Sequence, residues 1–217
     1  MSCAHGGQNA SGQMDVPART AQALQRRGFE CVIAKDANEA AQTVLASIPE
    51  NARVGIGGSM TIRELGIIEK MEERGNEVFH HWKPGLTEET DRKARKTEGL
   101  SDLYLTSANA ITEQGDIINI DGIGNRVAHM VFGPASVIIV AGVNKIVPDI
   151  DKGIRRSKDV AAVLNAKRIG SKAPCATAGK CVDCDSPARI CRVITIMQYR
   201  PWQTNVKVVL VDEPMGV

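Results

Sequence analysis

The chain has 217 residues, of which 43% are apolar and 24% charged, a balance that suits a globular protein with a buried core. Its net charge of +2 provides no basic field for a nucleic-acid backbone or a membrane surface, and aromatic residues at 3% offer few platforms for stacked bases. We therefore expect no nucleic-acid or membrane partner. No apolar run reaches roughly eighteen residues and no signal-peptide pattern opens the chain, which indicates a cytoplasmic protein with reduced cysteines.

Apolar patterning predicts alternating helices and strands from residue 15 onward, after a flexible N-terminal tail over residues 1–14. Helical periodicity and cap residues predict helices at about 16–27, 36–47, 59–71, 125–132 and 148–167. Residues 87–98 indicate a charged helix without a strong apolar face, which we expect to be exposed to solvent. Short β-rich runs predict strands at 29–34, 53–56, 77–80, 102–106, 136–141, 193–199 and 206–212. Residues 110–120 carry Gln114-Gly115-Asp116 between alternating apolar residues, which indicates a hairpin.

This alternation predicts one α/β domain over residues 15–217, with a cysteine-rich segment at 171–192. The expected architecture is a three-layer α/β/α fold around a largely parallel, doubly wound sheet. In such sheets ligands bind beyond the carboxyl ends of the strands. Two glycine-rich turns fall at such ends, and we therefore take them as candidate site elements.

The first glycine-rich turn, Gly57-Gly58-Ser59-Met60-Thr61, joins a predicted strand to a predicted helix. Glycines allow close backbone approach to a ligand, and the free N–H groups of a helix start together with the Ser59 and Thr61 hydroxyls form an anion seat. The turn is neither a phosphate-binding P-loop nor a dinucleotide fingerprint, because the required lysine and glycine spacing are absent. The alternative is a tight turn followed by a helix cap.

The second glycine-rich turn is Asp121-Gly122-Ile123-Gly124-Asn125-Arg126. Asn125 could cap the next helix, and Arg126 lies in the first turn of that helix. A cation at a helix N-terminus opposes the helix dipole and needs a partner. A bound carboxylate or phosphate is one candidate partner, and nearby Asp121 is the other. Lys145, after the strand at 136–141, could reach the same anion or be a solvated loop lysine.

Two further groups are candidates for acid–base or nucleophilic chemistry. Glu113 could act as a base or nucleophile at the edge of the crevice, or be an exposed hairpin carboxylate. His80 and His81 end a predicted strand, where neighbouring side chains point in opposite directions, so one of them could face the crevice.

Four of the six cysteines form a C-x5-C-x2-C-x6-C pattern: Cys175, Cys181, Cys184 and Cys191. Four thiolates can hold one [4Fe–4S] cluster or one tetrahedral zinc ion. A single C-x2-C pair with flanking cysteines is closer to iron–sulfur spacing than to a zinc ribbon. Lys180, Arg189 and Arg192 would offset part of the thiolate charge. Redox-labile or unliganded thiols are the remaining alternative.

Over roughly residues 15–217 the chain resembles the lactate-utilisation (LUD) domain family, in the branch of stand-alone, cysteine-bearing members. The resemblance rests on Gly57–Thr61, Glu64–Gly66, Asn109–Glu113 and Asp121–Val127. The family is similar to the superfold of ribose-5-phosphate isomerase, glucosamine-6-phosphate isomerase and coenzyme A transferases. That likeness implies small phosphates, carboxylates or acyl-CoA at the glycine-rich loops.

The same resemblance implies that Glu113 could be a nucleophile. The stretch Thr112-Glu113-Gln114-Gly115 is faintly similar to the one that carries the nucleophile of coenzyme A transferases. We expect a small anionic organic acid or sugar phosphate on Gly57–Thr61, facing Asn125 and Arg126. The protein would be an enzyme or enzyme subunit of lactate-type organic-acid metabolism. The alternatives are an iron–sulfur electron-transfer protein with a redox partner, and a ligand sensor with a structural metal. An oligomer is compatible with the sequence.

Overall fold

The computed structural model describes residues 14–217, so the predicted N-terminal tail lies outside the described residues except for Met14. The first helix, α1, spans Val16–Arg26. It begins there because the Asp15 side chain accepts a hydrogen bond from the Ala18 amide at 2.9 Å and Pro17 occupies the first turn.

The main sheet has six strands in the order β1-β10-β7-β4-β2-β3, and all neighbouring pairs are parallel. Its strands are β1 (Glu30–Ala34), β10 (Asn205–Val211), β7 (Ser136–Gly142), β4 (Leu103–Thr106), β2 (Arg53–Ile56) and β3 (Glu77–Phe79). The central strand β7 is buried from its second residue to its last, as its Val-Ile-Ile-Val run predicts. The predicted α/β fold with a parallel, doubly wound sheet is confirmed.

A second, mixed sheet of four strands has the order β8-β5-β6-β9. Its strands are β8 (Ile146–Val147), β5 (Ala110–Thr112), β6 (Ile117–Asp121) and β9 (Val193–Met197). The predicted hairpin is the antiparallel β5–β6 pair, and β9 also runs antiparallel to β6. The sequence patterns did not indicate that these strands leave the main sheet.

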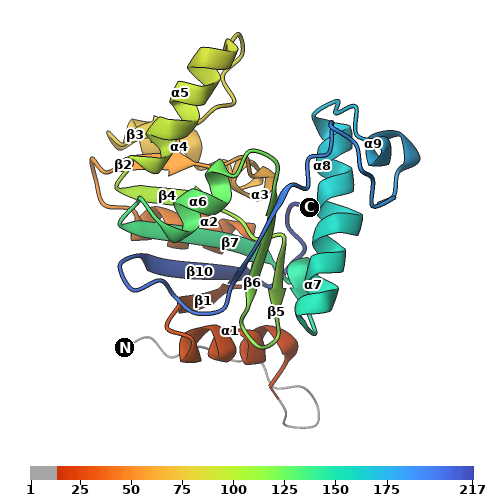
Figure 1. The fold of residues 1–217 in the computed structure, drawn as a ribbon. Coiled ribbons are helices and arrows are strands. Elements are labelled where there is room, and N and C mark those ends of the chain that lie inside the picture. Colours follow the sequence, from red (N-terminus) through yellow and green to blue (C-terminus); the bar gives the residue numbers. More distant parts are fainter. Residues whose placement is uncertain (1–13) are drawn as a thin grey trace.

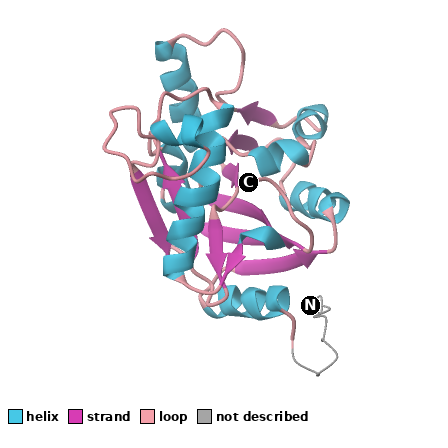
Figure 2. Ribbon diagram, turned by 90° about the vertical axis from the view of Figure 1, so that its right-hand side faces the viewer, coloured by secondary structure: helices cyan, strands magenta, loops and turns pink. Residues whose placement is uncertain are grey.

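Helices and the second sheet cover the two faces of the main sheet (Figures 1 and 2). One face is covered by α2 (Ala37–Ser47), α3 (Met60–Glu64) and α4 (Ile68–Glu73), whose buried side chains include Val44, Ile62 and Met71. The other face is covered by α1, α6 (Asn125–Val131) and the second sheet, through Leu24, Met130, Ile111 and Ile117. The helix α5 (Glu88–Gly99) lies against α6, β2 and β3.

A long helical run follows β8 and packs on the second sheet (Figure 2). It consists of α7 (Ile150–Arg156), a π-helical segment η2 (Ser157–Ala162) and α8 (Val163–Arg168), in place of the single α-helix that was predicted. The short helix α9 (Pro174–Ala178) in the cysteine-rich segment then packs on α8.

The predicted helix over 59–71 is also interrupted. Gly66 adopts a φ of +60° between α3 and α4, a conformation that ends a helix readily only at glycine. No helix within residues 14–217 is long and apolar enough to cross a membrane.

Candidate functional site

A cleft of about 280 Å³ lies where β2, β3, β4 and β7 end. Its wall is formed by the loops after these strands, by α6, by the π-helical segment and α8, and by the last residues of the chain. Of the residues predicted for the anion site, the cleft lining contains Gly58, Ser59, Thr61, Asn125, Arg126 and Lys145. These residues come from segments that are up to about ninety positions apart in the sequence. They meet because the carboxyl ends of parallel strands lie at the same edge of the sheet.

Lys145 is the buried cation of this cleft, with 2% of its surface exposed. Its ammonium donates hydrogen bonds to Thr61 Oγ1 at 2.8 Å and to Ser107 Oγ at 2.9 Å. It forms no ion pair with any carboxylate of residues 14–217. Burial, followed by the charges of Arg156 and Arg126, lowers the pKa of Lys145 from 10.5 to about 7.

The first glycine-rich turn combines a helix cap with a contact to this lysine. The Ser59 side chain caps α3 by accepting from the Ile62 amide at 3.3 Å, while Thr61 binds Lys145. Gly57 is needed for packing, because a Cβ atom there would overlap the Tyr104 hydroxyl. A Cβ atom on Gly58 would lie 3.4 Å from His81 Nε2, so Gly58 lies beside that imidazole.

Arg126 has partners within the protein. Its Nε lies 3.5 Å from Asp121 Oδ2, and its Nη2 donates to Asn109 Oδ1 at 3.1 Å and to the carbonyl of Ile120. The side chain is 13% exposed and lines the cleft. Asp121, the alternative partner considered from the sequence, is therefore in place, and Arg126 contributes its positive charge to the cleft wall at the same time.

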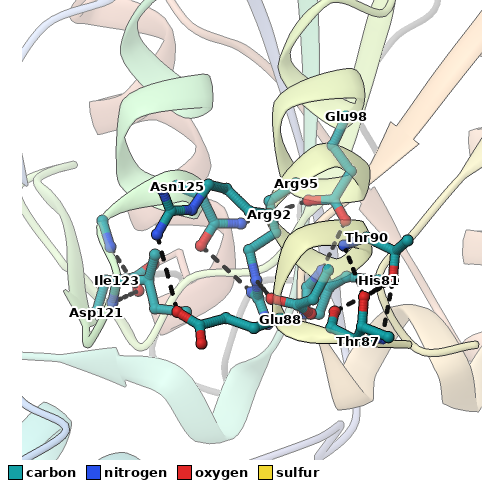
Figure 3. A network of polar contacts seen from close by, with 12 residues as sticks. His81, Thr87, Glu88, Thr90, Arg92, Arg95, Glu98, Asp121, Ile123 and Asn125 are labelled. Carbon is teal, nitrogen blue, oxygen red and sulfur yellow. Dashed lines mark hydrogen bonds and ion pairs between the residues drawn. The ribbon is translucent and has the colours of Figure 1, made fainter. Parts of the chain in front are cut away.

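The helix after the second turn begins differently from the sequence expectation. Its N-cap is Gly124, with φ of +95°, and Asn125 is the first helical residue rather than the cap. The Asp121 side chain accepts from the amides of Ile123 and Gly124, both at 3.1 Å. This frees the Asn125 side chain, which donates to Glu98 Oε2 at 3.4 Å and accepts from Arg95 at 3.5 Å (Figure 3).

A histidine–carboxylate pair forms another part of the wall (Figure 3). The Nδ1 atom of His81 lies 2.6 Å from Glu98 Oε1, and the Glu98 side chain is fully buried. Because Nδ1 faces the carboxylate, Nε2 is the ring nitrogen on the side of Gly58 and the cleft. A histidine held in this way can accept or donate a proton at Nε2.

Positive charge dominates the cleft. Its lining contains Arg95, Arg126, Lys145 and Arg168, against the single carboxylate of Asp121 among the side chains. The last residues of the chain cover the Lys145 end: the Gly216 amide donates to Glu64 Oε2 at 2.7 Å, and a Cβ atom on Gly216 would overlap Thr61 Oγ1. This arrangement favours a small anion over a neutral or cationic ligand.

Glu113 is not part of this cleft. Its carboxylate lies 3.2 Å from Arg19 on α1, at the turn of the β5–β6 hairpin, and it is absent from the cleft lining. The turn of this hairpin packs on α1, because a Cβ atom on Gly115 would lie 2.9 Å from the backbone of Ala23 and Leu24. The structure therefore gives Glu113 an ion-pair partner but no place beside the other predicted site residues.

The cysteine-rich segment begins at α9, which carries Cys175 and packs on the side of α8 away from the main sheet (Figure 1). It returns to the cleft at Cys191, between Ile190 and Arg192. Cys175 is buried with Val163 and Ala166, and Cys181 packs on the same cluster. Burial, then the neighbouring thiols of Cys184, Cys191 and Cys181, raises the pKa of Cys175, so the other three thiols lie within electrostatic range of Cys175. All four are free thiols.

The chain around these cysteines is organised by Arg189. Its guanidinium donates to the carbonyls of Cys184 at 2.8 Å and Cys191 at 3.0 Å. As arranged, residues 14–217 contain no group of three Cys, His, Asp or Glu side chains close enough to enclose a metal ion. Four-thiolate ligation would therefore require the side chains to turn inward around Cys175.

The cysteine-rich segment returns directly to the cleft. The Arg192 amide donates to the Asp121 carbonyl at 3.0 Å, and Ile190 lines the cleft. A Cβ atom on Gly122 would lie 2.9 Å from the Ile190 carbonyl oxygen, so the two backbones are in close contact.

Comparison with known families matches residues 18–211 to the LUD domain. The chain belongs to the LUD domain family. No curated protein matches it. Its structure is similar to the crystal structure of a DUF162 family protein from Deinococcus radiodurans, with a TM-score of 0.52 and 16% identity over 90% of this chain and 96% of that chain. At this identity the likeness shows a shared fold.

Several residues of this LUD domain's cleft were not among the sequence candidates. Ser107 and Asn109 follow β4, and their position after a predicted strand was the signal that could have found them. Arg95 lies on α5, which the charge pattern indicated only as an exposed helix, and the same helix carries Glu98, the buried partner of the cleft residue His81. Arg168 comes from α8, and no local pattern shows that this helix reaches the strand ends.

Proposed function

We propose that this LUD domain binds a small carboxylate or phosphate metabolite in the cleft, as an enzyme or enzyme subunit in organic-acid metabolism. The observation that carries the proposal is the buried ammonium of Lys145, which has two hydroxyl partners and no carboxylate partner. Burying a cation without a counter-charge is unfavourable. A bound anion would supply that counter-charge, and Arg126 lines the same cleft.

The size of the cleft supports a small ligand. A volume of about 280 Å³ lies at the lower end of ligand pockets in proteins and suits a short organic acid or a sugar phosphate. The glycine-rich turn contributes Ser59 and Thr61, but its hydroxyls are engaged with the Ile62 amide and Lys145. The proposal therefore assigns most of the attraction to the cationic side chains.

Thermal unfolding in the presence of lactate, phosphate and sulfate tests this proposal. An anion at a hundredfold excess over its dissociation constant stabilises the folded state by about 2.7 kcal/mol. We expect a rise in melting temperature for the wild type and for Lys35→Met, a control that removes an exposed lysine with a 77% exposed side chain. Lys145→Met should lose most of the rise. An equal rise in both variants would place the anion elsewhere.

A second proposal concerns Cys175, Cys181, Cys184 and Cys191, which we assign to one metal centre, a [4Fe–4S] cluster or a zinc ion. The support is the spacing of the four cysteines in the sequence, the electrostatic effect of the other three thiols on Cys175, and the positive charge of Arg189 beside Cys184 and Cys191. Thiolates are the ligands that both centres take. An iron–sulfur centre would make the domain an electron-transfer partner of a redox protein. A zinc ion would instead be a structural metal that stabilises the cysteine-rich segment.

Metal analysis and visible absorption of anaerobically purified protein distinguish these outcomes. Iron, sulfide and a broad visible band would support the iron–sulfur centre, whereas one equivalent of zinc in colourless protein would support the structural metal. Replacing any of the four cysteines by Ser should lower metal content. Cys31→Ala is the matched control, since Cys31 is buried in β1 on the main sheet. Full metal content in two of the four Ser variants would contradict a shared centre.

A further inference from the structure

Lys145 has the surroundings of a reactive amine as well as those of an anion-binding cation. Its side chain crosses the protein interior, and its Nζ ends between Thr61 Oγ1 and Ser107 Oγ in the cleft wall. Hydroxyl groups can accept from an ammonium and can equally hydrogen-bond to a neutral amine. Neither hydroxyl neutralises the charge, so neither holds the lysine in its protonated form as a carboxylate would.

Charged groups on three elements act on this amine. Burial has the largest effect, Arg156 of α7 and Arg126 of α6 act in the same direction, and Glu64 of α3 opposes them. Together they lower the pKa of Lys145 to about 7. Each unit of that decrease raises the neutral, nucleophilic fraction at neutral pH about tenfold over an ordinary lysine.

The neighbouring cations decide which carbonyl compound fits. Arg126 and Arg168 line the same cleft of about 280 Å³ as Lys145, so a ligand whose carboxylate binds these cations would lie in the cleft that the amine also borders. A carbonyl carbon next to that carboxylate is an electrophile that a neutral amine can attack. We propose that Lys145 forms an imine with the carbonyl carbon of a small 2-oxo acid, an inference that rests on the anion-binding function proposed above and names its substrate class.

The reaction needs no other reactant. The lone pair of the neutral Nζ adds to the carbonyl carbon, and a proton moves from nitrogen to the carbonyl oxygen to give a carbinolamine. The oxygen then leaves as water with the second amine hydrogen, and a C=N bond remains. His81 Nε2, on the side of the cleft beside Gly58, is the ring nitrogen available to carry protons in these steps.

Reductive trapping tests the proposal on the full chain. The protein is incubated with pyruvate and sodium cyanoborohydride, whose hydride converts an imine into a stable secondary amine, and the adduct is located by intact-mass and peptide mass spectrometry. We expect one adduct per chain, at Lys145. Trapping should disappear in Lys145→Met, persist in Lys35→Met, and be suppressed by lactate, which has the carboxylate but no carbonyl group.

Thermal shift with lactate on the same preparations separates this inference from the proposed function. A lactate shift without a pyruvate adduct at Lys145 would overturn the imine and leave anion binding in place. A wild type that shows neither a lactate shift nor a pyruvate adduct would overturn both proposals. Because lactate competition is measured on the wild type, a Lys145→Met variant that fails to fold does not weaken the test. Adducts spread over exposed lysines and insensitive to lactate would also overturn the imine.

Discussion

The imidazole of His81 and the carboxylate of Glu98 lie 2.6 Å apart, with the Glu98 side chain at 0% exposure. The helix α5 was predicted from its charge pattern as a solvent-exposed element, yet its last turn brings this carboxylate into the interior. Asn125 is the only other described side chain that donates to it, at 3.4 Å. The pair therefore anchors α5 to the loop after β3.

We predict that His81→Ala destabilises the protein more than Glu98→Gln does. Removing the histidine leaves a buried carboxylate without its partner, which costs about 3–5 kcal/mol, whereas the amide of Gln keeps a neutral hydrogen bond to His81 and costs about 1 kcal/mol. Urea unfolding of both variants measures the difference, and the double variant should lie near Glu98→Gln. Equal losses in the two single variants would contradict this prediction.

We predict that the free energy of unfolding rises with pH between about 7 and 10 because of Lys145. The folded state releases this proton at a pKa of about 7, while the unfolded chain holds it to 10.5. Between these values the unfolded state binds more protons, so raising the pH favours the folded state by up to about 1.4 kcal/mol per unit. Below pH 7 the full cost of the buried charge is present.

The difference in stability between wild type and Lys145→Met isolates this effect from other titrating groups. As the pH increases through this range, the free energy of unfolding of the wild type should rise relative to that of Lys145→Met. A difference that does not change with pH would show that Lys145 keeps its proton in the folded protein.

We predict that Gly57→Ala and Gly58→Ala, one position apart, have different consequences. At Gly57 the added methyl group would overlap the hydroxyl of the fully buried Tyr104, and overpacking of this kind costs about 1–3 kcal/mol. At Gly58 it meets His81 Nε2 at 3.4 Å, which small movements accommodate. Melting temperatures without ligand provide the comparison, and similar losses would contradict it.

We predict that Arg126→Lys weakens lactate or phosphate binding by about 1.5–3 kcal/mol, the range of a hydrogen bond to a charged group. Lysine also cannot reach Asn109, Ile120 and Asp121 together, so some stability should be lost. Titration calorimetry and thermal unfolding of this one variant measure both effects. Reduced stability with unchanged affinity would restrict Arg126 to supporting its protein partners.

Local sequence patterns were sufficient to predict most strands of the main sheet. The apolar run before Gly142, the helical spacing over 16–27 and the turn at Gln114 to Asp116 each act within a few residues, and the structure contains the corresponding strand, helix and hairpin. The order of the strands and the departure of β9 into a second sheet depend on contacts between distant segments. Such contacts leave no periodic signal in a single sequence.

The site was predictable to a similar extent. Residues at the carboxyl ends of strands, such as Thr61 and Lys145, were found because parallel topology brings those ends together. The His81–Glu98 pair required knowing how α5 packs. Which of the two roles left open for Glu113 its position favours depended on what the tip of its hairpin contacts. The need for Gly57 likewise comes from Tyr104, which is remote in sequence.

The contact between Ile190–Arg192 and Asp121–Gly122 gives the cysteine-rich segment and the cleft a shared backbone wall. If a metal centre changes the position of that wall, it changes the affinity of the cleft for an anion. Thermodynamic linkage then requires the anion to change metal affinity by the same factor. Metal-loaded and metal-stripped protein would therefore differ in lactate affinity. Lactate would in turn change the rate at which a chelator removes the metal.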